Sequence, residues 1–215
     1  MSAAQPANGA GLFSAADAAQ YDRHVGRYNA ELARALIAFA GVRPGQTALD
    51  VGCGPGALTR ELAAVLGAPN VSGVDPSPSF VAAARDRLPG IDIEVAPAEK
   101  LPFEADSFDH AFAQLVVNFM SDAPEGVAEM TRVTRSGGRV SAATWDLADG
   151  MTFLRRLWDA AINVDPAAAA LDEAVSMRYC TQDELAQLLE SAGLKRVKVS
   201  DFEVVDTGPV AGERK

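Results

Sequence analysis

Short apolar runs alternate with longer amphipathic stretches along this chain of 215 residues. Apolar side chains recur at helical spacing in the amphipathic stretches, and Gly, Pro and Asp bound the short runs, as is typical of buried strands. The pattern predicts strands over Thr47–Val51, Val71–Asp75, Ile91–Val95, Phe108–Gln114, Gly138–Trp145 and Lys195–Val205. It predicts helices over Gly26–Ala40, Gly56–Leu66, Ser77–Leu88, Pro124–Thr134 and Thr152–Asn163, and a last helix opened by a capping box at Thr181–Glu184.

This alternation predicts an α/β fold. Strands joined through helices by short loops form a Rossmann-like, doubly wound, mostly parallel sheet with helices on both faces. The length fits a single domain over residues 16–215, with a ligand-binding core over about 47–145. Residues 1–15 are predicted to be a disordered tail.

A glycine-rich turn follows the first predicted strand. Asp50 near the strand end is followed by Gly52, Gly54 and Gly56, after which helix-forming residues begin. Glycine permits a sharp turn and a close approach of the backbone to a ligand, and open parallel sheets bind ligands at the carboxyl ends of their strands. The turn therefore predicts a ligand site. With Ala57 it also fits the dinucleotide pattern G-x-G-x-x-A, and a plain turn without a ligand is a further alternative.

Two acids at strand ends narrow the choice of ligand. A pyrophosphate beside Asp50 would meet a negative charge with no basic residue nearby, whereas S-adenosylmethionine carries an ammonium and a sulfonium and no phosphate. Asp75 ends the second strand, where an acid can accept hydrogen bonds from both ribose hydroxyls of an adenosine group. Asp75 alone does not separate the two cofactors, and it is equally consistent with a carboxylate at a helix N-terminus. Asp50 favours S-adenosylmethionine over NAD.

Four segments, ALDVGCGPGALT, GVDPSPSFVAAAR, VAPAEKLPFEADSFDHAFAQ and VTRSGGRVSAATW, follow one another between about Thr47 and Trp145. In this order and spacing they resemble the class I S-adenosylmethionine-dependent methyltransferases of the small-molecule type, which include quinone-biosynthesis C-methyltransferases. The resemblance implies a methyltransferase that acts on a small molecule by in-line methyl transfer. An NAD-linked Rossmann oxidoreductase and a non-catalytic, methyltransferase-like binding protein are the alternatives.

The resemblance also implies roles for single residues. Ala98 and Glu99 are expected over the adenine with Leu101 and Phe103 nearby, and Asn118 and Phe119 are expected to face the acceptor. Arg27 is expected to pair with the methionine carboxylate, although a solvated helix face explains it equally well. The full set of expected cofactor contacts is Asp50, Gly52, Gly54, Gly56, Asp75, Pro76, Ala98, Glu99, Gln114 and Arg27.

The signal for a catalytic base is weak. His24 is the one candidate near the expected pocket, because His110 begins the fourth strand and so lies away from its carboxyl end. The chain has two histidines and two cysteines, none of them clustered, so no metal site is expected. Cys53, between two turn glycines, is predicted to be a small packing residue.

Charge and composition exclude several partners. The formal net charge is −10 and no block of Lys or Arg occurs, so nucleic acid is a poor candidate for the substrate. The Asn/Asp-Pro-Pro-aromatic motif of amino-methylating nucleic-acid enzymes is also absent after the fourth strand. No apolar run is long enough to span a bilayer, and the N-terminus does not look like a signal peptide. A cytoplasmic protein with a small-molecule acceptor and no membrane partner is expected.

One departure from the family concerns the C-terminus. The family's sheet normally ends in an antiparallel hairpin of two strands, whereas the tail after Lys195–Val205 is short, charged and contains Gly and Pro. The last antiparallel strand is therefore expected to be missing. An unpaired edge strand would either reduce the substrate pocket or favour a homodimer.

Overall fold

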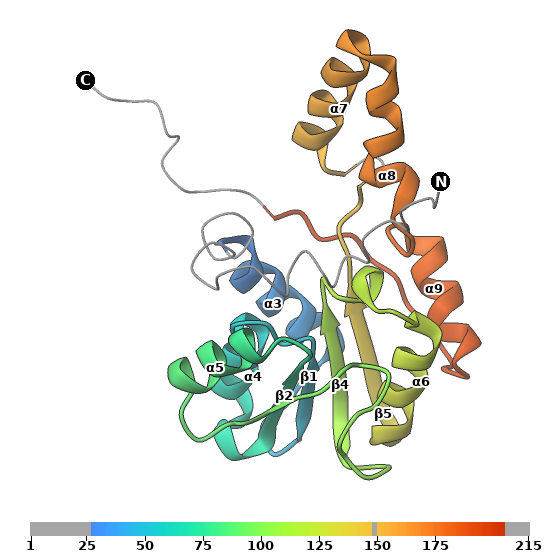
Figure 1. Cartoon of the computed structure of the whole chain (residues 1–215). Coiled ribbons are helices and arrows are strands. Elements are labelled where there is room, and N and C mark those ends of the chain that lie inside the picture. The colour runs from blue at the N-terminus through green and yellow to red at the C-terminus, as the bar shows by residue number, and fades with distance from the viewer. Residues whose placement is uncertain (1–26, 148–149, 205–215) are drawn as a thin grey trace, which may run out of the picture.

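A five-stranded, wholly parallel sheet forms the centre of the computed structural model, which describes residues 27–147 and 150–204 (Figure 1). The strands run in the order β3-β2-β1-β4-β5. Their bounds are β1 Ala48–Val51, β2 Val71–Asp75, β3 Asp92–Val95, β4 Phe108–Gln114 and β5 Thr134–Ala143. This arrangement confirms the predicted α/β class. The predicted tail over residues 1–15 lies outside the described residues.

Helices cover both faces of the sheet, as Figure 1 shows. The helical elements are α3 Arg27–Ala40, α4 Ala57–Leu66, η2 Ala68–Asn70, α5 Pro78–Arg87, η3 Val117–Phe119, α6 Ala123–Val133, α7 Thr152–Val164, η4 Pro166–Leu171, α8 Glu173–Ser176 and α9 Gln182–Ser191. The capping box before α9 is confirmed, because the Thr181 hydroxyl accepts a hydrogen bond from the Glu184 N–H at 3.3 Å. None of the helices in these two ranges has the length and apolar character needed to cross a membrane.

Alternate side chains of β1 belong to two different hydrophobic cores, one on each face of the sheet. Leu49 and Val51 join a buried cluster with α6 and α9, whereas Ala48 joins a cluster with α3 and α4. Side chains of a strand point to alternate faces, so Asp50 shares the face of Ala48. The acid is therefore directed toward α4, and it is buried there.

The strand order places the carboxyl ends of three strands together. The chain proceeds outward from β1 to β2 and β3 and then returns to β4 on the other side of β1. In the register, Asp50 lies beside Gly73 of β2 and Phe112 of β4. Asp75 and Gln114 then end β2 and β4 at the same edge of the sheet. Such a reversal of strand order is where open α/β sheets bind ligands.

The predicted strand over Lys195–Val205 is wrong for residues 195–204, where the chain is irregular. Arg196 has a φ of 60°, which strand geometry does not allow, and most side chains of the segment are exposed. Phe202 instead packs edge-on against Phe39 of α3, with ring centroids 5.6 Å apart. Within the described ranges the sheet therefore ends at β5. The second strand of the family's hairpin would fall on residues outside them.

The start of β5 also differs from the prediction. The strand predicted over Gly138–Trp145 begins earlier, because residues 134–137 also belong to β5, with an irregularity between Thr134 and Arg139. Arg135 in this stretch forms an ion pair with Asp109 of β4, which holds the irregular stretch beside the sheet.

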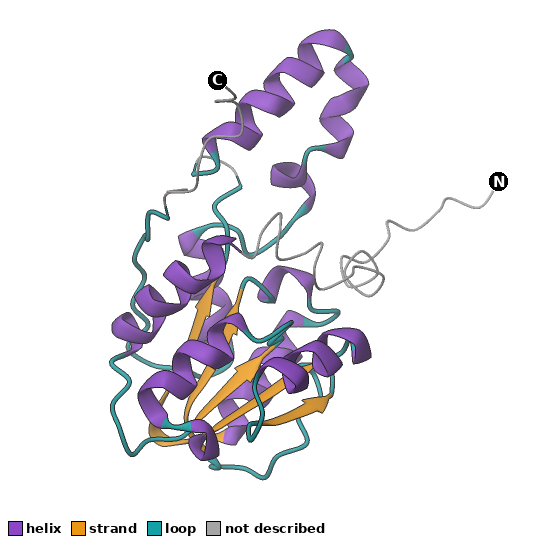
Figure 2. Cartoon of the chain, turned by 90° about the vertical axis from the view of Figure 1, so that its left-hand side faces the viewer, coloured by secondary structure: helices purple, strands orange, loops and turns teal. Residues whose placement is uncertain are grey.

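The helices α7, η4 and α8 form an arm that projects from the carboxyl edge of the sheet (Figure 2). No residue of α7 is buried. The Arg155 guanidinium holds both carboxylate oxygens of Asp172 at 2.7 and 2.5 Å, and the Trp158 indole N–H donates to Glu173 at 2.5 Å. These polar contacts join α7 to α8 and bring the base of the arm over the sheet edge.

Candidate functional site

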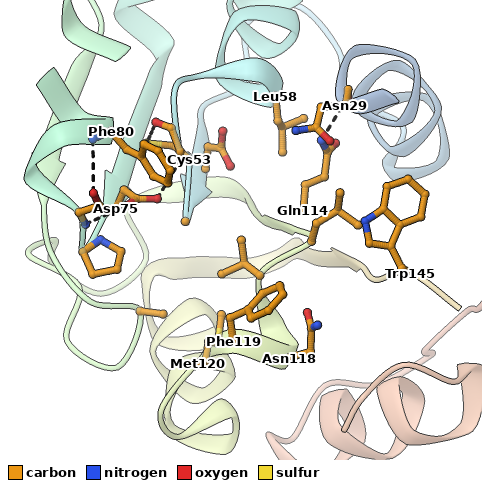
Figure 3. A pocket seen from close by; sticks show the side chains of 18 of the residues that line it. Asn29, Cys53, Leu58, Asp75, Phe80, Gln114, Asn118, Phe119, Met120 and Trp145 are labelled. Atoms are coloured by element: carbon orange, nitrogen blue, oxygen red, sulfur yellow. Dashed lines mark hydrogen bonds between the residues drawn. The ribbon is translucent and has the colours of Figure 1, made fainter. Parts of the chain in front are cut away.

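A cavity of about 600 Å³ opens at the carboxyl ends of β1, β2 and β4 (Figure 3). Its wall includes the glycine turn after β1, the acid that ends β2, the end of β4 with η3, and side chains from the base of the arm. Pockets for small ligands have volumes of roughly 300–1,000 Å³. The cavity is therefore large enough for a cofactor-sized molecule and lies at the edge that the sequence predicts.

Gly52 and Gly54 line this cavity and need glycine for different reasons. Gly52 has a φ of 69°, and a Cβ there would lie 2.5 Å from the Val116 side chain. Gly54 has a φ of 52°, but a Cβ there would meet no atom within 4 Å. Gly52 is thus fixed by packing inside the protein. Gly54 leaves open space in which a ligand can approach the backbone.

Gly56 does not lie on the cavity wall, in contrast to its predicted place among the cofactor contacts. It is the N-cap of α4 with a φ of 94°, and a Cβ there would lie 2.5 Å from Cδ1 of Leu88. The close approach of α4 to the end of α5 therefore explains this glycine.

Asp50 is a buried acid on the cavity wall, with 1% of its surface exposed. The Thr59 hydroxyl donates to its carboxylate at 2.6 Å. Burial raises the pKa of Asp50 to about 7, because the hydrogen bonds from Thr59 only partly offset the loss of solvation and the nearby charge of Asp75 adds to it. A bound cation would favour the ionised form. The carboxyl group is therefore suited to a positively charged ligand.

Asp75 links the end of β2 to the glycine turn. One carboxylate oxygen accepts from the Gly54 N–H at 2.9 Å and the other from the Ser77 N–H at 2.8 Å. Burial raises its pKa, and these two backbone hydrogen bonds act in the opposite direction. An ionised carboxylate has about four acceptor positions, so the group can still accept from hydroxyls. Ser77, rather than Asp75, caps α5 by accepting from the Phe80 N–H.

The segment after β3 contributes only part of what the sequence predicts. Ala98 and Glu99 line the cavity, as does Pro76 of the loop after β2. Leu101 and Phe103 do not line it. They belong to the apolar core beneath the loop, where Phe103 packs edge-on against Phe108 with centroids 5.0 Å apart. Both residues are apolar because of that packing.

Gln114 closes β4 and faces the cavity with an acceptor atom. Its side-chain N–H donates to the Asn29 carbonyl oxygen at 3.1 Å (Figure 3). Its Oε1 is buried and, within the described ranges, has no hydrogen-bond partner. Leu115 turns the chain immediately afterwards with a φ of 60°, a conformation that non-glycine residues rarely adopt outside functional or strained sites. The end of β4 thus carries a buried acceptor on the cavity wall that has no donor among the described residues.

Asn29 of α3 is a wall residue that sequence reasoning missed. A signal for it exists, because Asn29 precedes Leu32, Ala33 and Leu36 at helical spacing and so lies on the buried face of its helix. A polar side chain on that face needs a partner or a ligand. The backbone oxygen of Asn29, which accepts from the Gln114 side chain, connects α3 to the end of β4.

Asn118 and Phe119 of η3 lie on the wall, as expected, but most of the surrounding residues were not predicted. They come from segments far apart in the sequence and are mostly apolar, so no local motif identifies them. Further wall residues are Cys53, Leu58, Phe80, Met120, Ser121, Trp145, Leu147, Met151, Leu154, Glu173 and Met177.

Neither Cys53 nor His110 is equipped for chemistry here. Burial, together with the charges of Asp50 and Asp75, holds the pKa of the Cys53 thiol well above its usual value, so the sulfur packs rather than reacts. His110 is buried away from the cavity, with Nε2 3.1 Å from Oε1 of Gln46, and burial lowers its pKa. His24 and the side chain of Arg27 lie outside the described residues.

Comparison with known proteins identifies the family. The family described as a methyltransferase domain matches residues 49–142. The chain is 34% identical over 209 residues to the ubiquinone/menaquinone biosynthesis C-methyltransferase UbiE of Burkholderia cenocepacia, covering 88% of this chain and 85% of that protein. The chain belongs to the class I S-adenosylmethionine-dependent methyltransferases. The malonyl-[acyl-carrier protein] O-methyltransferase of Salmonella typhimurium is a further relative, 32% identical over 157 residues, or 73% of this chain and 61% of that protein.

The fold of this chain has solved counterparts. A chain of the complex between the Haloferax volcanii Trm112 methyltransferase activator and a methyltransferase matches with a TM-score of 0.69 and 24% identity, covering 96% of this chain and 86% of that chain. At this identity the match establishes the fold alone. The chain spans between 32 and 61% of the length of four other curated relatives.

Proposed function

We propose that the protein transfers a methyl group from S-adenosylmethionine to a small molecule. One observation carries the proposal: Asp50, Asp75 and Gln114 line one cavity at the ends of neighbouring parallel strands, as two buried acids and an amide oxygen that has no partner among the described residues. This set of acceptors matches a ligand with a positive charge and ribose hydroxyls. Family membership supports the same cofactor.

The residues of this chain fit the cofactor from one end to the other. Asp50, the Gly52–Gly54 turn and Oε1 of Gln114 would hold the positively charged methionine portion, for which open space exists at Gly54. Asp75 with Pro76 would hold the ribose, and Ala98 with Glu99 the adenine. Arg27, at the start of α3, would pair with the carboxylate of the cofactor's methionine portion. These assignments follow the family pattern, with Gly56 given a packing role instead.

The chain's contribution to the reaction is mainly positional. The sulfonium of S-adenosylmethionine supplies an activated methyl group and a good leaving group. The protein must hold the acceptor atom in line with that group and exclude water, and such alignment is worth on the order of 7–11 kcal/mol. The mostly apolar wall of the cavity serves this purpose. The relatives act on different acceptors, as their names state, so the acceptor has to be inferred from this chain's own wall.

Calorimetric titration with S-adenosylmethionine, S-adenosylhomocysteine and NAD tests the proposal. We expect binding of the first two at micromolar concentration and no binding of NAD, because the pyrophosphate would lie against Asp50. Binding of NAD alone would reject the assignment, as would the absence of binding by all three ligands.

Replacing Thr59 with Val is expected to shift the pH dependence of cofactor binding. Affinity of the unmodified protein should fall as the pH drops below 7, because Asp50, with a pKa of about 7, then takes up a proton. The Thr59 hydrogen bond stabilises the ionised carboxylate, so its loss should raise the pKa further and move the fall in affinity to higher pH. Titrations between pH 5.5 and pH 8.5, a range of about three units around that pKa, measure the shift.

Thr131→Val is the matched control. Its hydroxyl donates to the Val127 carbonyl oxygen within α6 at 2.8 Å, and the residue does not line the cavity. This variant should retain the original pH profile. A Thr59→Val profile that coincides with the control would show that the ionisation of Asp50 does not govern binding.

A further inference from the structure

The cavity has a second side, which we call the acceptor side, formed by Asn118, Phe119, Trp145, Met151, Glu173 and Met177. Figure 3 shows Asn118, Phe119 and Trp145 across the cavity from Asp75 and Phe80. The side chains come from η3, the segment after β5 and the base of the arm. Four of the six are apolar, with two methionines and two aromatic rings, and such side chains accommodate a flat or irregular apolar molecule.

Both polar groups on the acceptor side present hydrogen-bond acceptors. Oδ1 of Asn118 is buried and lacks a hydrogen-bond partner among the described residues, while its N–H group is directed to the Met177 sulfur at 3.6 Å. The Glu173 carboxylate lies on the wall and accepts from the Trp158 indole N–H at 2.5 Å through Oε2, and an ionised carboxylate has further acceptor positions. A buried acceptor without a donor carries a desolvation cost that a suitable ligand would remove.

The charged residues of the cavity wall also favour a ligand that donates hydrogen bonds. Its charged residues within the described ranges are all acids: Asp50, Asp75, Glu99 and Glu173. None of the arginines near the arm lines the cavity in the described residues: the Arg155 guanidinium holds Asp172, the Arg178 guanidinium lies 4.9 Å from the centre of the Tyr179 ring, and Arg156 of α7 is exposed. An anionic group on the acceptor side would therefore be desolvated close to a carboxylate.

We propose that the methyl acceptor is an apolar molecule that donates a hydroxyl or amine hydrogen bond to Glu173 and Asn118, and that the site rejects carboxylate and phosphate acceptors. The inference rests on the proposed function, because only methyl transfer makes the bound molecule a methyl acceptor. The selectivity of the cavity wall for such molecules can be measured independently of methyl transfer. Glu173 is a recognition residue in this account.

A matched series of naphthalenes tests the selectivity. The probes are 2-naphthol, 2-naphthylmethylamine, 2-naphthoate and 2-methylnaphthalene, titrated calorimetrically into the full chain with and without saturating S-adenosylhomocysteine. We expect 2-naphthol and 2-naphthylmethylamine to bind at least about tenfold more tightly than 2-naphthoate and 2-methylnaphthalene. A hydrogen bond to a charged group is worth about that factor or more. Equal or tighter binding of 2-naphthoate, equal binding of 2-methylnaphthalene, or no binding of any probe would overturn the inference.

Glu173→Gln separates charge from shape. The amide keeps an oxygen for the Trp158 N–H, so the arm should keep its structure, while affinity for 2-naphthylmethylamine should fall about tenfold. Glu190→Gln removes the same charge from the exposed end of α9, outside the cavity, and should change nothing. An unchanged Glu173→Gln affinity would reject the role of Glu173.

S-adenosylhomocysteine binding, measured in the same titrations, distinguishes failure of this inference from failure of the proposed function. If S-adenosylhomocysteine binds but the probes are not discriminated, the acceptor class is wrong and methyl transfer stands. If the probes are discriminated but S-adenosylhomocysteine does not bind, the acceptor side is as inferred and the cofactor assignment fails.

Discussion

Asp50→Asn is expected to weaken S-adenosylmethionine binding by about 100-fold or more and, at pH 8, to stabilise the folded protein. The loss of affinity follows because the variant removes the charge that meets the positive end of the ligand, and loss of one partner of a buried ion pair costs about 3 kcal/mol or more. The amide keeps an acceptor for the Thr59 hydroxyl, so the local structure should persist. Calorimetric titration measures the first effect and urea unfolding the second.

The gain in stability has a definite pH dependence. The pKa of Asp50 rises from an ordinary 3.8 to about 7 on folding, so the ionised carboxylate destabilises the native state as the pH rises from about 4 through 7. Above pH 7 the cost reaches up to roughly 4 kcal/mol, at about 1.4 kcal/mol for each pKa unit. The variant should lose this advantage below about pH 4. An Asp50→Asn protein that folds normally and binds S-adenosylmethionine with unchanged affinity would contradict the role given to this acid.

Gly54→Ala is expected to block the cofactor with little further damage to the fold. The added methyl group would enter open space on the cavity wall, where the backbone approaches the ligand. We expect affinity for S-adenosylmethionine to fall by more than about tenfold, together with a loss of about 1–2 kcal/mol of stability from the left-handed backbone. The backbone N–H at this position would still donate to Asp75, so the turn should keep its connection to β2.

Gly45→Ala provides the control for backbone strain. Gly45 has a φ of 87° and a Cβ there would also meet no atom within 4 Å, but the residue precedes β1 and does not line the cavity. It should lose a comparable amount of stability in thermal unfolding and keep full cofactor affinity. If both variants bind S-adenosylmethionine equally well, Gly54 does not lie against the ligand.

The part of the cavity wall formed by the ends of β1 and β2 could be predicted because its signals are local. The acids at the ends of β1 and β2 and the glycines between strand and helix are adjacent in sequence, and parallel pairing then brings those strand ends together. The bounds of β2 and β4 were predicted to the residue, since each is a short segment that ends at a polar side chain before a turn. The place of Gly56 could not be predicted from the motif. The spacing of the glycines does not distinguish a glycine that packs against Leu88 from one that contacts a ligand.

On the acceptor side only Asn118 and Phe119 could be predicted to reach the cavity, because tertiary packing alone brings the other residues there. Glu173 and Met177 reach the cavity only because Arg155 and Trp158 hold α7 against α8, and no sequence spacing specifies that contact. The failed strand over residues 195–204 has a related cause. Its alternating Val residues imitate a strand, but a strand also needs a neighbour with free hydrogen-bonding groups, and here the chain turns at Arg196 instead.

A crystal structure of the full chain with S-adenosylhomocysteine would show whether this cavity binds the cofactor. We expect ribose hydroxyls on the Asp75 carboxylate, the amino group close to Asp50 and Oε1 of Gln114, and the backbone of Gly54 against the ligand. The sulfur should then face the acceptor side near Asn118 and Phe119. A ligand bound outside this cavity, or bound in it with its ribose away from Asp75, would contradict the account.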